Sequence, residues 1–106
     1  MIPGDLDAGL RAKLESLEKL CGKALAYTSG RRTPEENARA GGVDGSAHLS
    51  GKAVDIACAN GSERWRLVTN AVKAGFVRIG IGRTFVHLDV DEAKPQAVIW
   101  TCYPTA

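Results

Sequence analysis

Two short segments alternate between apolar and other side chains, and this alternation constrains the fold most strongly. Residues 53–58 read Ala-Val-Asp-Ile-Ala-Cys, and residues 85–90 read Phe-Val-His-Leu-Asp-Val. Because successive side chains of a strand point to opposite faces, each segment predicts a strand with one apolar face on a core. The other faces then carry Asp55 on the first strand and His87 and Asp89 on the second. The alternation therefore predicts a sheet with polar groups on one face.

Helix signals separate these strands from one another. Leucines every three or four residues predict an amphipathic helix over residues 5–21. Residues 33–36 (Thr-Pro-Glu-Glu) form a capping pattern that starts a short helix ending at Ala40. Ser62 is expected to cap a longer helix that ends at Ala74. Strands are predicted over 23–28, 53–58, 77–81, 84–90 and 97–102. The expected fold is α+β, an antiparallel sheet with helices packed on one side.

Length, composition and charge limit the number of domains and the kinds of partner that this chain can have. With 106 residues, 44% of them hydrophobic and 25% charged, the chain is expected to form a single domain over residues 1–106. A net charge of +2 without a block of like charges argues against nucleic acid as a partner. No apolar run is long enough for a membrane span, and the first residues lack the pattern of a signal peptide. We expect a monomer.

The three cysteines, Cys21, Cys58 and Cys102, are not spaced as metal ligands. Their odd number argues against a full disulfide framework, and buried thiols are the simpler interpretation. A bridge between Cys58 and Cys102, or between Cys21 and Cys58, stays open for a protein that works outside the cytoplasm.

The only two histidines of the chain, His48 and His87, fall into a pattern compatible with a metal site. Together with Asp55 they offer two imidazoles and a carboxylate. Three protein ligands with an open position are typical of catalytic zinc. The alternative is that each histidine is a packed or surface residue and that Asp55 caps a turn. Spacing alone leaves these two interpretations about even.

Three motifs together resemble a known family. They are residues 29–37 (Ser-Gly-Arg-Arg-Thr-Pro-Glu-Glu-Asn), residues 46–55 (Ser-x-His-x-x-Gly-x-Ala-x-Asp) and residues 85–90. In order and spacing they are similar to the zinc D-alanyl-D-alanine carboxypeptidases, peptidoglycan peptidases that include phage endolysins and are related to the hedgehog zinc domain. The resemblance implies a hedgehog/DD-peptidase-like fold. It also implies Zn²⁺ as the cofactor, with His48, Asp55 and His87 as its ligands.

Three further residues are expected around the metal, and the resemblance implies the role of the first. Arg32 matches the arginine that holds a substrate carboxylate, whereas a purely local role would pair it with Glu35 or Glu36. Ser46 is expected at the substrate-binding side, where it braces the His48 loop. Asp89 is the candidate for catalytic proton handling, and its alternative role is to orient a metal ligand through a hydrogen bond.

One departure from the family affects catalysis directly. Related branches carry the general base as a histidine two residues before the last ligand or as a glutamate three residues before it. These positions hold Phe85 and Thr84 in this chain, and neither side chain can act as a base. This branch therefore uses another carboxylate, or its site is catalytically weak.

These observations predict a zinc-dependent peptidase that cleaves peptidoglycan stem peptides, with a zinc-bound water attacking the scissile amide. It would be a D-Ala-D-Ala carboxypeptidase or an endolysin-type endopeptidase. The substrate places its action at the cell wall, for a phage-encoded protein or one exported by another route. The alternative is a non-catalytic zinc-binding module of the same fold, and a metal-free structural domain is the third hypothesis.

Overall fold

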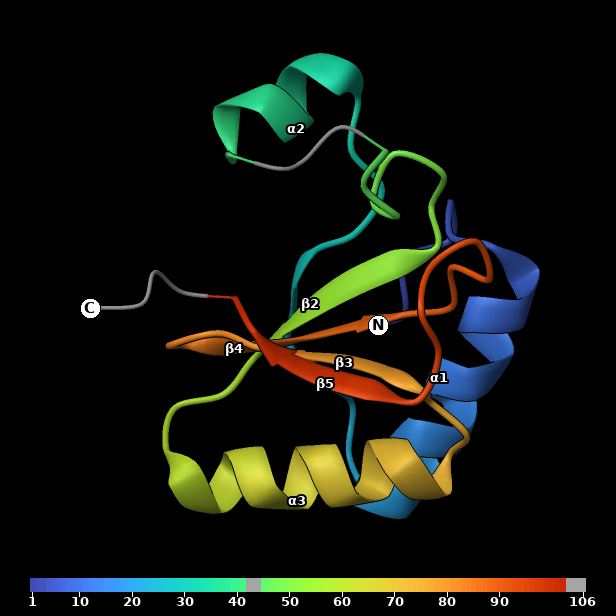
Figure 1. Ribbon diagram of the computed structural model, residues 1–106. Coiled ribbons are helices and arrows are strands. Elements are labelled where there is room, and N and C mark those ends of the chain that lie inside the picture. The colour runs from blue at the N-terminus through green and yellow to red at the C-terminus, as the bar shows by residue number, and fades with distance from the viewer. Residues whose placement is uncertain (42–44, 103–106) are drawn as a thin grey trace.

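The computed structural model describes residues 1–41 and 45–102, and Figure 1 shows their arrangement. The helices are α1 (Ala8–Cys21), α2 (Pro34–Arg39) and α3 (Gly61–Lys73). The strands are β1 (Tyr27–Ser29), β2 (Ala53–Ala57), β3 (Arg78–Ile81), β4 (Phe85–Asp89) and β5 (Val98–Thr101). The α+β fold class predicted from the sequence is confirmed. The sequence also predicts a loop over residues 43–52 that carries His48, and residues 43 and 44 of this loop lie outside the described part of the chain.

The five strands form one sheet in the order β1-β2-β4-β3-β5. Neighbouring strands are antiparallel except for β3 and β5, which are parallel. The prediction of a purely antiparallel sheet is therefore wrong for this pair. The end of β4 lies beside the beginning of β3, and residues 90–97 cross to β5 at this same end of the sheet, so β5 runs in the same direction as β3. Alternation in the sequence determines which face a side chain occupies, but it does not determine strand direction.

The core lies between the sheet and the two long helices, α1 and α3 (Figure 1). Its fully buried members include Leu10, Leu14 and Leu17 of α1, Val54 and Ile56 of β2, and Val86 and Leu88 of β4. The expectation of helices on one side holds for α1 and α3. The short helix α2 is set apart from both, and the residues that follow it, Ala40 and Gly41, border a cleft on the other face of the sheet.

Capping residues set the helix ends. Asp7 accepts a hydrogen bond from the Leu10 amide at 3.1 Å, and α1 ends at Gly22, whose φ of 73° lies in the left-handed region. The capping box expected at Thr33 is present in α2. Ser62 was expected to cap α3, but Asn60 caps it instead, because its side chain reaches the Glu63 amide at 2.9 Å.

Two further observations concern the cysteines and the helices. Cys21, Cys58 and Cys102 are free thiols in this structure. Among the described residues no helix has the length and apolar character needed to cross a bilayer.

Gly80 lies in a tightly packed part of the sheet, next to His87 on the polar face. It pairs with His87 on β4 and with Trp100 on β5, so a large ring lies on either side of it. A Cβ atom at this position would lie 2.5 Å from the Cys102 Sγ, 3.0 Å from the Trp100 ring and 3.1 Å from the His87 Cβ. The sheet therefore has no room for a side chain at this position.

We expect Gly80→Ala to lower the free energy of unfolding by about 1–3 kcal/mol, because the added methyl group overpacks the space beside His87. Gly61→Ala is the matched control, since nothing lies within 4 Å of a Cβ at that position, and its effect should stay within about 0.5 kcal/mol. Urea denaturation of the two variants measures the difference. Equal midpoints would contradict the packing described at Gly80.

Candidate metal centre

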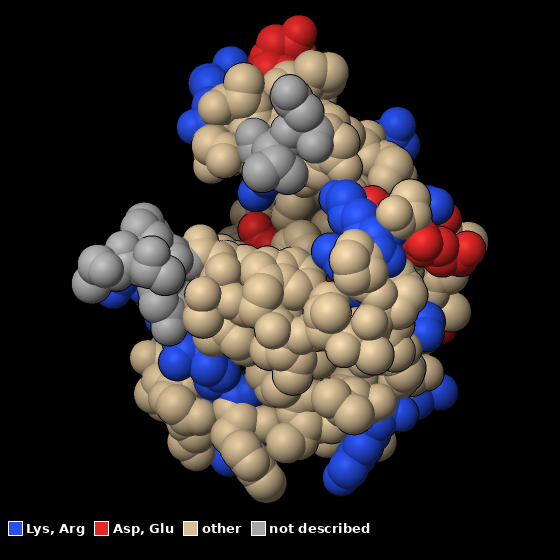
Figure 2. All heavy atoms as spheres, in the orientation of Figure 1, with Lys and Arg blue, Asp and Glu red and all other residues tan. Residues whose placement is uncertain are grey.

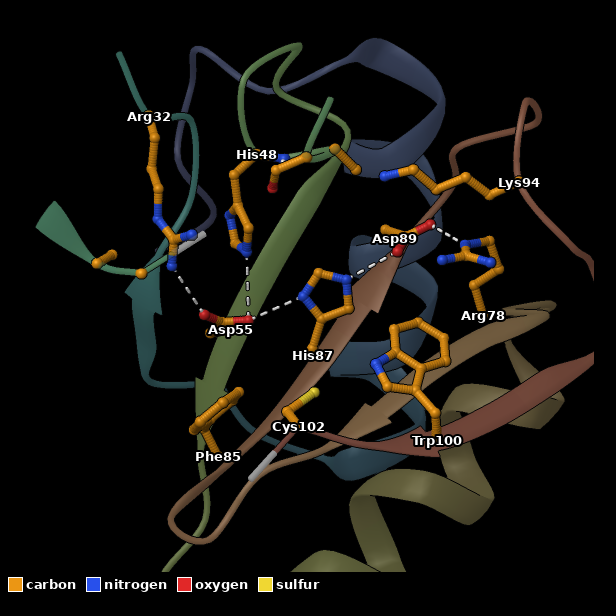
Figure 3. A pocket seen from close by; sticks show the side chains of 14 residues that line it. Arg32, His48, Asp55, Arg78, Phe85, His87, Asp89, Lys94, Trp100 and Cys102 are labelled. Atoms are coloured by element: carbon orange, nitrogen blue, oxygen red, sulfur yellow. Dashed lines mark hydrogen bonds and ion pairs between the residues drawn. The ribbon is translucent and has the colours of Figure 1, made fainter. Parts of the chain in front are cut away.

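Three potential metal ligands converge on the polar face of the sheet (Figure 3). Asp55 and His87 lie directly opposite each other in the antiparallel register of β2 and β4. His48 reaches the same point from the loop that precedes β2. The potential ligand atoms of the three side chains all lie within 4.8 Å of one another. In the described ranges, 1–41 and 45–102, no other group of His, Cys, Asp and Glu side chains is so arranged.

Backbone hydrogen bonds hold the loop that carries His48. The His48 carbonyl accepts from the Arg32 amide at 2.9 Å, which ties the loop to the segment after β1. The His48 amide donates to the Ser46 hydroxyl at 3.3 Å. Gly51, with a φ of 71°, closes the loop, and its carbonyl accepts from the Asp7 amide at 2.8 Å. Ser46 thus braces the loop and borders the cleft, and its role in substrate binding stays a prediction.

Each histidine has one nitrogen held by an acceptor and the other directed at Asp55. The Nδ1 atom of His48 lies 2.7 Å from the Gly30 carbonyl oxygen and donates to it, which leaves Nε2 as the nitrogen directed at Asp55. That Nε2 atom lies 3.4 Å from Oδ1 of Asp55. For His87 the order is reversed, with Nε2 2.7 Å from Oδ2 of Asp89 and Nδ1 3.0 Å from Oδ1 of Asp55.

This pattern of acceptors fits a metal ion. A metal-binding histidine usually donates its other ring N–H to a carboxylate or a backbone carbonyl, which orients the ring and raises its basicity. His48 uses a carbonyl for this purpose and His87 uses Asp89. Nε2 of His48, Nδ1 of His87 and a carboxylate oxygen of Asp55 are the atoms that would bind the ion. Two imidazoles, one carboxylate and an open side form the donor set of a catalytic zinc site.

Asp89 is buried and fully engaged. Its side chain is 1% exposed, Oδ2 faces His87, and Oδ1 lies 2.7 Å from Nε of Arg78 and accepts the Asp91 amide at 3.0 Å. The Arg78 guanidinium also donates to the Pro95 carbonyl at 2.6 Å and lies 4.7 Å above the Trp100 ring. The Asp89 carboxylate therefore links His87 to the Arg78 guanidinium, which other contacts hold in place.

Arg78 is a member of the site that sequence reasoning missed. A signal was available, because Arg78 is the one charged residue in the otherwise apolar run Val77–Ile81. A buried charge on a strand needs a partner of opposite charge, and the partner is Asp89 on the neighbouring strand, which lies opposite Arg78 when the pairing of Ile79 with Leu88 is continued by one residue.

Arg32 joins the same cluster from the other side. Its guanidinium donates to Ser29 Oγ at 3.1 Å, Asn37 Oδ1 at 3.4 Å and Asp55 Oδ2 at 3.3 Å. Its ion pair is with Asp55, whereas the Glu36 side chain closes the capping box of α2. The structure thus pairs Arg32 with Asp55 and not with Glu35 or Glu36, while its role in holding a substrate carboxylate stays a prediction.

A cleft of about 430 Å³ opens over the cluster. Figure 2 shows the hollow between the α2 lobe and the body of the molecule, with acidic atoms at its base and basic atoms near its rim. Phe85, at one of the two positions where related proteins carry a base, lines this cleft together with Lys94 and Cys102. Thr84, at the other position, lines a separate depression instead.

The cluster shifts the ionisation of its members. Burial disfavours the charge on Asp55, but hydrogen bonds from His48 and His87 outweigh it, so the pKa of Asp55 lies below its usual range. Burial also works against the charge on His87, yet its hydrogen bonds to Asp55 and Asp89 raise its pKa. For Asp89 burial is outweighed by His87 and Arg78, and the pKa is lowered. In the metal-free cluster these contacts therefore favour the charged forms of Asp55, His87 and Asp89.

The sheet thus carries a His-Asp-His cluster that could hold a metal ion at the base of an open cleft. A comparison with protein families finds a match to the family described as Peptidase M15 over residues 6–90. The match covers most of the chain, so the chain belongs to this zinc D-Ala-D-Ala carboxypeptidase-related family. The resemblance drawn from the sequence is therefore confirmed, and the family is zinc-dependent. No curated protein matches the chain.

We expect the purified protein to bind one zinc ion, and His48→Ala, Asp55→Ala and His87→Ala should each reduce zinc occupancy, because each removes one of only three protein ligands. Zinc should raise the melting temperature, since it binds the folded state preferentially. Elemental analysis and thermal denaturation with and without a chelator measure both effects. Unchanged zinc occupancy in all three variants, or a melting temperature that the chelator does not change, would contradict the assignment of this metal site.

The stability of the metal-free protein and the strength of zinc binding should respond to rising pH in opposite directions. The raised pKa of His87 stabilises the metal-free fold below about pH 6.5, its unfolded value, and this contribution is lost as pH rises through the folded pKa. The lowered pKa values of Asp55 and Asp89 stabilise the fold above about pH 4, and this contribution is lost as the solution becomes more acidic. Zinc binding requires unprotonated imidazole, so it strengthens as pH rises.

Melting temperatures of zinc-loaded and chelated protein should therefore diverge between pH 6 and pH 8. The chelated protein should lose stability over this interval while the zinc-loaded protein does not. A constant difference across the interval would show that His87 does not exchange a proton for the metal.

Proposed function

We propose that this protein is a zinc-dependent peptidase that hydrolyses peptidoglycan stem peptides, as a carboxypeptidase or as an endolysin-type endopeptidase. The observation that carries the proposal is the arrangement of nitrogen atoms at the base of the cleft. Nε2 of His48 and Nδ1 of His87 both face Asp55, while their second nitrogens are held by Gly30 and Asp89. Membership of the Peptidase M15 family supports the reaction class.

We assign metal binding to three residues of the cleft and substrate binding to Arg32. A zinc ion held by His48, Asp55 and His87 would supply Lewis-acid polarisation of the scissile carbonyl and a water of lowered pKa. Arg32 has five N–H groups, and three of them are used within the protein. The remaining two are free to bind a substrate carboxylate in the bidentate manner that guanidinium favours. Arg32 thus sets the register of the peptide in the cleft.

We propose that Asp89 is a positioning residue. Its two oxygens are occupied by His87, Arg78 and the Asp91 amide, and its side chain is almost fully buried. An ionised carboxylate with a lowered pKa in this position accepts the Nε2 proton of His87 and keeps Nδ1 directed at the metal position. Proton handling by Asp89 is the competing role, and the variant described below separates the two.

A second candidate function rests on one observation. Phe85 lines the cleft at a position where related proteins carry their base, and its ring cannot accept a proton. A non-catalytic zinc-binding module would show this substitution. The two candidates agree on the metal site and differ only in turnover.

Mass spectrometry of muropeptides incubated with the zinc-loaded protein tests the proposed function. We expect products shortened by one D-alanine or cleaved within the stem or cross-bridge. Arg32→Lys should keep the zinc and the fold but lose most of this activity, because an ammonium group cannot reproduce the bidentate contact. Phe85→His serves as a gain-of-function probe. Full zinc occupancy without any product would favour the non-catalytic module.

Asp89→Asn should separate positioning from proton transfer. If Asp89 orients His87, the variant should bind zinc roughly 10–100-fold more weakly and recover activity in excess metal. If Asp89 is the base, zinc should remain bound while turnover disappears. Glu92→Gln is the control, an exposed carboxylate three residues along the chain. Zinc content and turnover are measured on the same preparations, and normal values of both would remove Asp89 from the site.

A further inference from the structure

We infer that Lys94 forms a second anion-binding position in the cleft, and that the substrate carries a carboxylate on each side of the scissile amide. This inference rests on the proposed function and narrows its substrate class to acidic peptides. Lys94 lies beyond residues 6–90, the part of the chain that matches the family.

Arg32 and Lys94 lie on opposite sides of the metal cluster. Figure 3 shows Arg32 beyond Asp55 on one side and Lys94 beyond Asp89 on the other, with His87 between them. The sheet order explains this separation. Arg32 follows β1, the strand at one edge, whereas Lys94 belongs to the segment that joins β4 to β5, the strand at the other edge. A peptide that crosses the metal position would therefore have one cation at each end.

The Lys94 ammonium group has a donor available to a ligand. Its Nζ donates to the Gly45 carbonyl at 2.9 Å and lies 3.3 Å from Oδ2 of Asp91. An ammonium group has three N–H donors, so these two contacts leave one. The side chain is 30% exposed and lines the cleft, so the third donor is accessible from solvent. The two protein contacts hold the flexible stem and reduce the entropy lost when a ligand binds.

The charges around the cleft favour an anionic ligand. Its lining contains the cations Arg32, Arg78 and Lys94 and the carboxylates Asp55 and Asp89. Arg78 is committed to Asp89 by a 2.7 Å ion pair, and Asp55 would be neutralised further by a divalent metal. Each of the three cations is ion-paired and keeps unused N–H donors, but the Arg78 side chain is only 9% exposed, against 16% for Arg32 and 30% for Lys94, so Arg32 and Lys94 are the cations more accessible to a ligand. In a carboxypeptidase the terminal carboxylate lies on the amine side of the scissile bond, so we place it at Arg32, which leaves Lys94 for an acidic group on the acyl side.

Two synthetic stem peptides test this assignment. They share one sequence and differ only in the acyl-side acidic group, which is a free carboxylate in one and a carboxamide in the other. The zinc-loaded wild-type protein should cleave the carboxylate peptide with a kcat/KM about tenfold higher, the size of one charge-assisted contact. Lys94→Met should abolish this preference, and Lys94→Arg should retain it. Lys73→Met is the matched control, because Lys73 is an exposed lysine at the end of α3, which packs on the other face of the sheet.

Calorimetry with the same two peptides carrying an N-methylated, uncleavable scissile amide gives a readout that does not depend on turnover. The carboxylate form should bind about tenfold more tightly to the wild type and equally to Lys94→Met. Equal binding and cleavage of both peptides by the wild type would overturn the inference and leave the peptidase intact. If Lys94→Met weakens the binding and cleavage of both peptides by the same factor, Lys94 does not bind the substrate, and its only role is to hold the loop at Gly45; this result would also overturn the inference. Absence of cleavage with a preserved binding preference would instead count against the proposed function.

Discussion

The antiparallel register of β2 and β4 places Asp55 opposite His87, and the rest of the site depends on this pairing. The residues on either side of this pair, Val54 and Ile56 on β2 and Val86 and Leu88 on β4, are at most 1% exposed. A slip of one residue would bury the carboxylate and the imidazole in the core and expose these apolar side chains. Burial of the apolar face against α1 and α3 therefore also fixes the position of the two ligands on the opposite face. The stability of the core and the geometry of the site are consequences of one register.

Support for this pair comes from parts of the chain that are distant in sequence. Gly30, after β1, orients His48, and Arg78, on β3, supports Asp89 and through it His87. In the metal-free state these contacts balance positive and negative groups within the cluster, which is why the pKa of His87 rises while those of both aspartates fall. The same contacts direct two nitrogens and one carboxylate at a single point. The metal-free cluster therefore already has the arrangement that a bound cation would need.

Much of this arrangement could be predicted from the sequence, and the reasons are physical. Alternation over 53–58 and 85–90 assigned Asp55, His87 and Asp89 to one face, because the period of a strand is two residues. Capping chemistry located α2, and leucine spacing located α1. The direction of β5 could not be predicted in this way, because the path of residues 90–97 decides it. The choice of ring nitrogen in each histidine and the support from Arg78 depend on tertiary contacts, which no local pattern encodes.

Anomalous diffraction from crystals of the zinc-loaded protein tests the central claim most directly. The account predicts a zinc peak about 2.0–2.2 Å from Nε2 of His48, Nδ1 of His87 and an oxygen of Asp55, with Asp89 bound to the far nitrogen of His87 and not to the metal. A peak at the Cys102 thiol, coordination through Nε2 of His87, or Asp89 as a direct ligand would contradict it.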